Sequence, residues 1–156
     1  MPFKIVIISG SQSGAERAAL DWSVKHELPR GGWCPGGLTE PMDPVYKLKE
    51  ASTEKMLEVI DANVRDSEAT IVFTLGPKAT GFAQKAGAAA RKQKKPILHV
   101  HRGILGVSEK IVAFLDKYYV RRLHVTGSTE ADEPGLATWV TSELEKSKVI
   151  LDRRPE

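Results

Sequence analysis

Short apolar runs alternate with amphipathic segments along this chain, and that alternation limits the folds open to it. The runs are rich in β-branched residues, as buried strands of a parallel sheet are, and they span residues 3–8, 69–75, 96–101 and 121–126. A shorter strand is expected around Trp33. The intervening segments carry apolar residues at helical spacing, such as Ala15, Ala18, Ala19 and Trp22. This order predicts right-handed βαβ units, and so an α/β fold: a Rossmann-like three-layer sandwich with a mostly parallel sheet of about five strands and helices on both faces.

Length and composition narrow the class further. The 156 residues suit one domain, 1–156, with a core of its own. With 41% hydrophobic and 28% charged residues, disorder and fibrous repeats are poor interpretations. The net charge of +3 is too small to indicate nucleic acid by itself, but it suits a small anionic ligand. There is no run long enough for a membrane span and no signal-peptide pattern, and the one cysteine, Cys34, excludes an intrachain disulfide. We therefore expect a cytoplasmic protein.

Three loops leave the carboxyl ends of predicted strands, where parallel sheets bind their ligands. The first is Gly10–Gly14, whose two glycines allow torsions closed to other residues and whose Ser11 and Ser13 add hydroxyls. With the helix N-terminus behind it, this loop predicts a phosphate cradle. It matches neither a P-loop nor Gly-x-Gly-x-x-Gly, and the alternative is a tight strand-to-helix turn.

The second loop, residues 76–81, follows Thr74 and carries Lys78 before a helix that opens at Thr80-Gly81. It could hold a second phosphate or a ribose-like hydroxyl; alternatively, Thr80 only caps the helix and Lys78 lies in solvent. The third loop covers residues 127–135. We expect an anion between the first two loops, because two helix N-termini would meet there at adjacent strand ends.

Other candidate residues are better explained by a structural role than by catalysis or metal binding. His99 and His101 share a strand face without an evident third ligand, so no metal site is predicted. Cys34 has no evident activating partner, and no catalytic residue is assigned. Glu16 falls in the first turn of a helix, where the dipole favours a carboxylate. The segment from Arg30 to Pro44 is rich in glycine and proline, and a long loop of this kind is usually functional.

The segment Ser9–Asp21 resembles the opening motif of the putative molybdenum carrier family, molybdenum cofactor carrier-like proteins within a wider Rossmann group that includes the LOG proteins and DNA-processing protein A. Further agreement lies in residues 31–35 and 63–70, and in Gly127, Glu130 and Pro134-Gly135, so that the match covers nearly the whole chain. The family usually has Gly-Gly-Gln-Thr-Gly-Ala-Asp, where this chain has Ser11, Ser13 and Glu16 in place of the second glycine, the threonine and the aspartate.

The resemblance implies a non-catalytic carrier that binds the phosphorylated pterin of the molybdenum cofactor (molybdopterin), or a related phosphorylated nucleotide. It also implies a homo-oligomer, with molybdoenzymes as cofactor acceptors. The residues expected to bind the ligand are Gly10, Ser11, Gln12, Ser13, Gly14, Arg17, Trp33, Thr74, Gly76, Lys78, Thr80, Gly81, Gly127 and Glu130.

An enzyme is the alternative from the same wider group. LOG-type proteins release the base from a nucleoside monophosphate with Pro-Gly-Gly-x-Gly-Thr followed by a glutamate. The segment Pro35–Glu40 imitates that motif, but it lacks the Gly-Thr step and is expected in an irregular loop instead of directly after a central strand. A nucleic-acid binder would rest on the basic runs alone and is the least favoured class.

Overall fold

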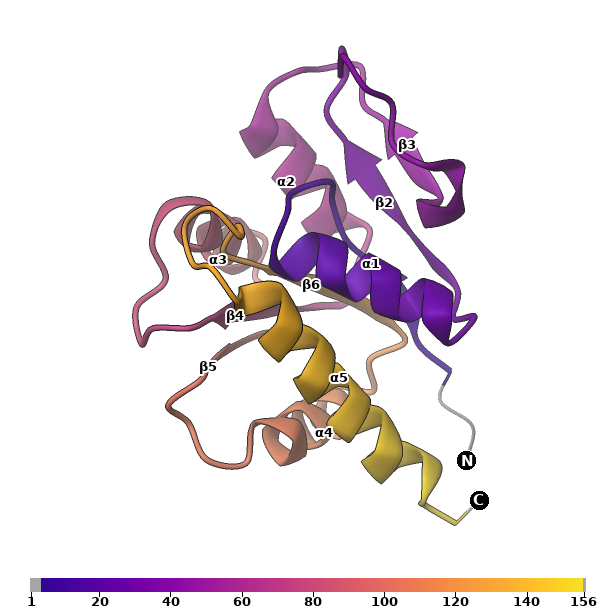
Figure 1. The fold of residues 1–156 in the computed structure, drawn as a ribbon, viewed down its shortest axis with the longest axis vertical. Helices are drawn as coiled ribbons and strands as arrows, with labels where there is room; N and C mark the ends of the chain where they lie inside the picture. Colours follow the sequence, from indigo (N-terminus) through magenta and orange to yellow (C-terminus); the bar gives the residue numbers. More distant parts are fainter. Residues whose placement is uncertain (1–3, 156) are drawn as a thin grey trace.

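A computed structural model describes residues 4–155. Phe3, the start of the first predicted strand, lies outside the described residues. The elements in chain order are β1 (Val6–Ile8), α1 (Ala15–Lys25), β2 (Arg30–Cys34), the 3-10 helix η1 (Pro44–Tyr46), β3 (Leu48–Glu50), α2 (Met56–Arg65), β4 (Ala69–Thr74), α3 (Gly81–Lys92), β5 (Ile97–His101), α4 (Val107–Lys117), β6 (Arg122–Gly127) and α5 (Leu136–Asp152). Figure 1 shows their arrangement.

The strands form one six-stranded sheet in the order β3-β2-β1-β6-β4-β5. Every neighbouring pair is parallel, which confirms the predicted class. The last strand in the chain, β6, is therefore central, with β1 on one side and β4 on the other. If β6 preceded β1, the spatial order would read 4-3-2-1-5-6, a doubly wound order that reverses beside its first strand, as the 3-2-1-4-5-6 order of Rossmann sheets does.

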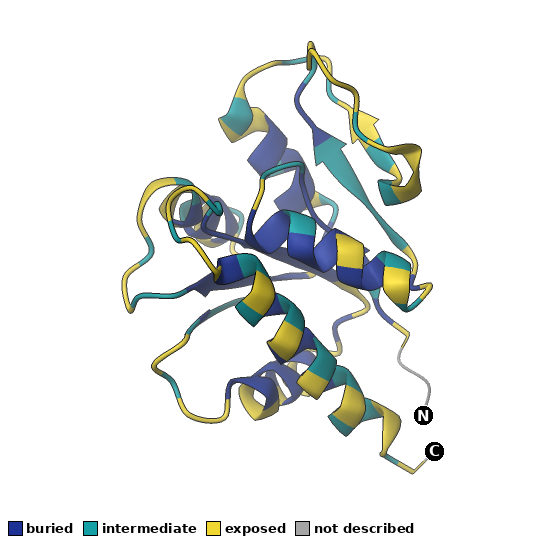
Figure 2. Cartoon of the chain, viewed as in Figure 1, coloured by how far each residue is buried: buried dark blue, intermediate teal, exposed yellow. Residues whose placement is uncertain are grey.

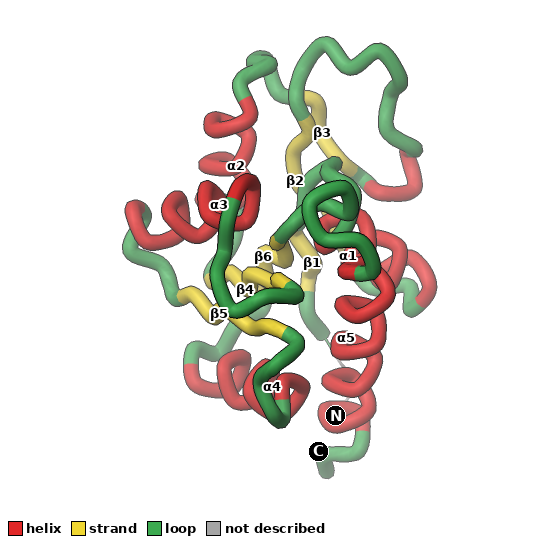
Figure 3. The backbone as a smooth tube through the Cα atoms, turned by 60° about the vertical axis from the view of Figure 1, so that its left-hand side comes forward, coloured by secondary structure: helices red, strands yellow, loops and turns green. Residues whose placement is uncertain are grey.

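Helices cover both faces of the sheet, as expected (Figure 3). On one face the apolar residues of α1, α4 and α5 pack with β1, β4 and β6 in the larger core cluster. On the other face α2 and α3 form a smaller cluster around Ile60, Val64 and three alanines. All six residues of β4 are buried, because the strand lies between the two layers. Figure 2 shows burial concentrated in the central strands and on the inward sides of the helices, whereas β2 is half-buried and β3 is largely exposed.

The glycine- and proline-rich segment differs most from expectation. The short strand around Trp33 is β2, and it continues beyond the end of β1 to pair with β3 at the sheet edge. The sequence analysis did not predict β3, whose residues are half-buried or exposed, so the sheet has six strands where about five were expected. None of the described helices is long and apolar enough to cross a membrane.

Candidate functional site

The three predicted loops leave the carboxyl ends of β1, β6 and β4, which are neighbours in the sheet. The sequence analysis placed the first two loops on adjacent strands, which is wrong, because β6 lies between β1 and β4. The β6–α5 loop joins them. On one side the N–H of Ala15 donates to the Ser128 carbonyl at 3.2 Å, and on the other the N–H of Ser128 donates to the Phe73 carbonyl at 3.1 Å.

Carboxylates of the chain itself occupy main-chain N–H groups in all three loops. In the first loop, the N–H of Gln12 donates to Glu16 Oε1 at 3.1 Å, and the Thr126 hydroxyl on β6 donates to Glu16 Oε2 at 3.0 Å. Glu16 is only 3% exposed. Burial raises its pKa from the ordinary 4.5 to about 7, against the opposing effect of the hydrogen bonds from Gln12 and Thr126.

The end of β4 holds the carboxylate of Glu133. Its Oε1 accepts the N–H of Leu75 at 3.0 Å and the Ser128 hydroxyl at 2.6 Å, while Oε2 accepts the N–H of Gly76 at 2.9 Å. Desolvation opposes ionisation of Glu133, but the hydrogen bonds from Ser128, Gly76 and Leu75 outweigh it and lower the pKa. An ionised glutamate therefore occupies the N–H of Gly76, which is one of the residues expected to bind the ligand, together with that of Leu75.

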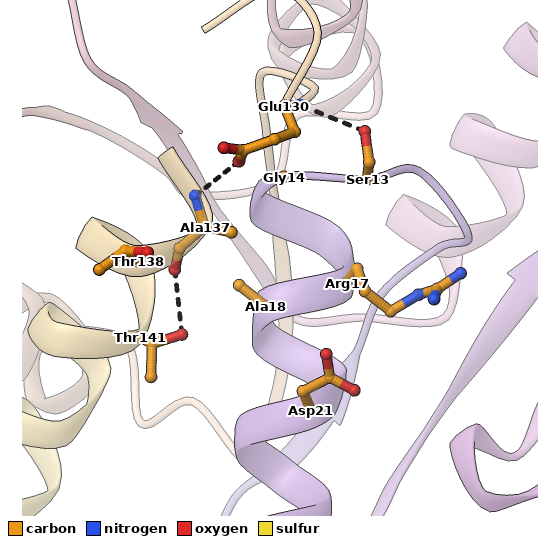
Figure 4. Close-up of a pocket in the computed structure, with 9 residues that line it drawn as sticks. All are labelled: Ser13, Gly14, Arg17, Ala18, Asp21, Glu130, Ala137, Thr138 and Thr141. Atoms are coloured by element: carbon orange, nitrogen blue, oxygen red, sulfur yellow. Dashed lines mark hydrogen bonds between the residues drawn. The ribbon is translucent and has the colours of Figure 1, made fainter. Parts of the chain in front are cut away.

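Glu130 occupies the start of α5 in the same way. Its side chain accepts the N–H of Gly135 at 2.6 Å and that of Ala137 at 3.0 Å, and its own N–H donates to Ser13 Oγ at 3.1 Å. Figure 4 shows the contacts of Glu130 with Ser13 and Ala137. Glu130 thus caps a helix and joins two loops, which is a structural task beside the ligand contact expected of it.

By contrast, α1 and α3 begin without a side-chain cap. No side-chain hydrogen bond caps the first turn of α1, which starts after Gly14. Thr80 precedes α3 in an extended conformation and does not cap it, which removes the simple capping interpretation of this residue. Lys78, Thr80 and Gly81 are exposed. The start of α3 is therefore open to an anion, whereas α1 keeps few donors, because the N–H of Ala15 donates to the Ser128 carbonyl and that of Arg17 to the Gln12 carbonyl.

Two predicted ligand residues have their side chains engaged elsewhere. The Thr74 hydroxyl is buried, 2.7 Å from both the Gly76 carbonyl and His99 Nε2. The indole N–H of Trp33 donates to Asp66 at 2.7 Å, and the Trp33 N–H donates to Asn63 at 2.8 Å. Both contacts tie β2 to α2, so the structure gives Trp33 a packing role.

A pocket of about 390 Å³ lies between the first turns of α1 and α5 (Figure 4). It brings together four predicted residues: Ser13, Gly14, Arg17 and Glu130. The sequence analysis missed the other lining residues, which are Ala18, Asp21, Ala137, Thr138 and Thr141. Their only sequence signal is helical spacing along two helices that lie far apart in the chain.

Arg17 points from this pocket toward the η1 segment. Its guanidinium lies 5.1 Å from the ring centroid of Tyr46, and Nη2 is 3.6 Å from the sulfur of Met42. The Tyr46 hydroxyl donates to Asp21 at 2.5 Å. The segment before β3 is thereby anchored to α1, one turn below the first loop.

The remaining sequence candidates lie apart from this arrangement. Cys34 is buried, and burial, together with the charge of Glu50, raises the pKa of its thiol. Pro35 follows β2 directly, so the Pro35–Glu40 segment does begin at a strand end, although β2 is not one of the two central strands. Among residues 4–155, no three His, Cys, Asp or Glu side chains gather closely enough to hold a metal ion.

Comparison with known proteins places these features in a family. Residues 7–147 match the circularly permutated YpsA SLOG family. No curated protein matches the chain. Among solved structures, the chain is similar to a putative molybdenum carrier protein from Syntrophus aciditrophicus SB, with 29% identity, a TM-score of 0.86, and coverage of 94% of this chain and 96% of that chain. The resemblance inferred from the sequence is confirmed, and the central position of the last strand agrees with a permuted chain order. The chain belongs to the circularly permuted YpsA SLOG family.

Proposed function

We propose that this protein is a carrier that binds a phosphorylated small molecule above the carboxyl ends of β1, β6 and β4. The observation that carries the proposal is the exposed start of α3, which Thr80 does not cap, at the same edge of the sheet as the glycine- and serine-containing loop between β1 and α1. Helix N-termini attract phosphate through their N–H groups and the helix dipole. The similarity to a protein called a putative molybdenum carrier makes the phosphorylated pterin of the molybdenum cofactor our first candidate ligand, with a nucleotide as the second.

The internal carboxylates support this position for the phosphate. Glu133 and Glu130 already occupy the N–H groups at the end of β4 and the start of α5. An anion would be repelled there, and it would be favoured at the first-turn N–H groups of α3, on the side of Gly81 away from the Asp132 carboxylate. Lys78, exposed just before α3, adds the positive charge nearest in sequence to that helix start.

An apolar wall beside the first loop supports a ligand with a flat ring. Gln12 Nε2 lies 4.0 Å from the sulfur of Met56, the first residue of α2. Met56 and Phe82 are both partly buried and pack on the same α2–α3 cluster. Thioether and aromatic side chains suit the face of a pterin or a nucleobase. The ring would lie toward Met56 and Phe82, with the phosphate toward Gly14 and Gly81.

A phosphoribohydrolase of the LOG kind is the second candidate, because the raised pKa of Glu16 suits a general acid or base. Its carboxyl group, however, is buried beneath the first loop and bonded to Gln12 and Thr126. It cannot touch a substrate without rearrangement of that loop, so we favour a carrier. Such a carrier would work as a cytoplasmic homo-oligomer that delivers its ligand to molybdoenzymes.

The test begins with native mass spectrometry and molybdenum analysis of the purified protein, followed by titration with molybdopterin and with adenosine monophosphate. Lys78→Glu should weaken binding of either ligand tenfold or more, because it replaces an attractive charge with a repulsive one. Lys92→Glu is the matched control: it is an equally exposed lysine at the opposite end of α3, and it should bind normally.

Three results would count against the proposal. Equal ligand affinity of Lys78→Glu and Lys92→Glu would show that the ligand does not bind near Lys78. If no phosphorylated ligand copurifies with the protein or binds in the titrations, the proposed carrier function is wrong. Release of free adenine from the monophosphate at about 1 per second or faster would make the protein an enzyme.

A further inference from the structure

The carboxyl group of Glu16 lies directly beneath the loop proposed to bind the phosphate. A Cβ placed on Gly10 would come within 2.5 Å of Glu16 Oε1 and 3.1 Å of Oε2, so a larger residue at this position would displace the buried carboxyl group. Two residues further on, the N–H of Gln12 turns inward to the same group. The shape of the loop from Gly10 to Gln12 is therefore fitted to the carboxyl group below it.

No ion pair balances a charge on Glu16 among the described residues. The elements around it carry His124 on β6, Glu130 and Glu133 in the β6–α5 loop, Lys55 and Glu58 at the start of α2, and Arg17 and Asp21 on α1 itself. None of these groups forms a hydrogen bond or a salt bridge with the Glu16 carboxyl group, which accepts hydrogen bonds from the main-chain N–H of Gln12 and the hydroxyl of Thr126. Burial of His124 keeps its imidazole neutral, with a pKa of about 3. Ionised Glu16 would thus be an uncompensated negative charge under the loop.

We propose that an anionic ligand on the Ser11–Gly14 loop and a proton on Glu16 bind together. The inference rests on the proposed function, because it requires that the anion bind at this loop. Two like charges on opposite sides of one loop, without a counterion between them, repel each other in a medium of low polarity. The ligand therefore favours neutral Glu16, and solvent supplies one proton for each carboxylate that the ligand neutralises. Since burial brings the pKa of Glu16 to about 7, this exchange falls in the neutral range.

Sulfate is the probe of choice, because its charge does not change between pH 6 and 8. Calorimetric titrations in buffers of different ionisation enthalpy count the protons taken up. We expect an uptake of about half a proton at pH 7 and close to one at pH 8, with affinity falling up to about tenfold per pH unit above 7. Glu16→Gln should bind sulfate without proton uptake and without this pH dependence.

Glu109→Gln is the matched control for the loss of one charge. Glu109 is an exposed glutamate in the first turn of α4, a helix that follows the edge strand β5. This variant should keep the proton uptake of the parent protein. Lys78→Glu should abolish sulfate binding if the ion occupies the proposed site.

The outcomes separate this inference from the function on which it rests. Sulfate binding that Lys78→Glu abolishes but that proceeds without proton uptake would overturn the inference and leave the proposed function standing. Proton uptake that persists in Glu16→Gln would also overturn it, since another group would then take the proton. Absence of sulfate binding at every pH would overturn the inference together with the proposed anion site, while leaving the family assignment unchanged.

Discussion

The Glu133 carboxylate offers a direct measure of what the internal carboxylates contribute to stability. It accepts three hydrogen bonds, from the N–H groups of Leu75 and Gly76 and from the Ser128 hydroxyl. In Glu133→Gln, the amide offers one oxygen, and its NH2 group must face a main-chain donor. One charge-assisted hydrogen bond is lost and one N–H is left without an acceptor, at a cost of about 2–3 kcal/mol. Because solvent reaches part of this side chain, we expect about 2 kcal/mol, or roughly 4–8 °C in Tm.

Urea unfolding at pH 7, followed by tryptophan fluorescence, measures this loss. Asp132→Asn is the control, because Asp132 is the exposed neighbour of Glu133 and its variant should stay within about 0.5 kcal/mol of the parent protein. The pKa of Glu133 is lowered in the folded protein, so its stabilisation is complete above the ordinary value of 4.5 and is lost as pH falls through the folded value. The difference between parent and Glu133→Gln should therefore shrink below about pH 4.5. Equal stability of the two variants at pH 7 would refute this account of the end of β4.

Three further outcomes follow from the packing around the sheet. Gly32→Ala should prevent stable folding, because the φ of Gly32 is +138° and a Cβ there would lie 1.9 Å from the Ser9 carbonyl oxygen. Gly31→Ala should fold, since a Cβ on Gly31 would lie 3.6 Å from its nearest atom, and circular dichroism distinguishes the two variants. Glu16→Gln should remove a pH dependence of stability, because the pKa of Glu16 is raised to about 7 in the folded parent protein. The parent protein is then most stable below pH 4.5 and loses about 3 kcal/mol of unfolding free energy as pH rises through 7, so parallel plots of stability against pH for the two proteins would disprove the assignment. Lys95→Met should cost about 2–3 kcal/mol in urea unfolding, because its ammonium group caps α2 with three carbonyl contacts of 2.5–2.9 Å, while exposed Lys92→Met should change little.

The fold was predictable from the sequence where burial on both faces imposes a pattern. The segment forming β4 is apolar and β-branched nearly throughout, and the alanines of α3 mark its close approach to the sheet. The edge strand β3 carries no such mark, since Leu48 is half-buried and Lys49 and Glu50 are exposed. Charged residues are typical of edge strands because they discourage further pairing, but singly they cannot be told from a loop.

The loops of the candidate site were predictable from the sequence, but the hydrogen bonds that join them were not. Glycine and serine at strand ends indicated three loops that the structure does bring to one edge of the sheet, because parallel strands present their carboxyl ends there. The partners of Glu133 and Glu16 lie up to 58 and 110 positions away in the chain, and no local pattern links them. The insertion of β6 between β1 and β4 is likewise a property of the sheet order, which strand–helix alternation leaves open.

The central place of β6 also bears on how the chain folds during synthesis. The other five strands leave the ribosome first, and they can form only two separate ribbons, β1–β2–β3 and β4–β5, since no hydrogen bonds join β1 to β4. Each ribbon exposes a long inner edge, which is a template for wrong pairing. β6 then closes both edges at once through pairings such as Val6 with Arg122, contacts of high sequence separation that form slowly. The loops that follow β1, β4 and β6 are brought together only at that step, so a nascent chain that stops short of β6 has neither a continuous sheet nor the proposed binding site.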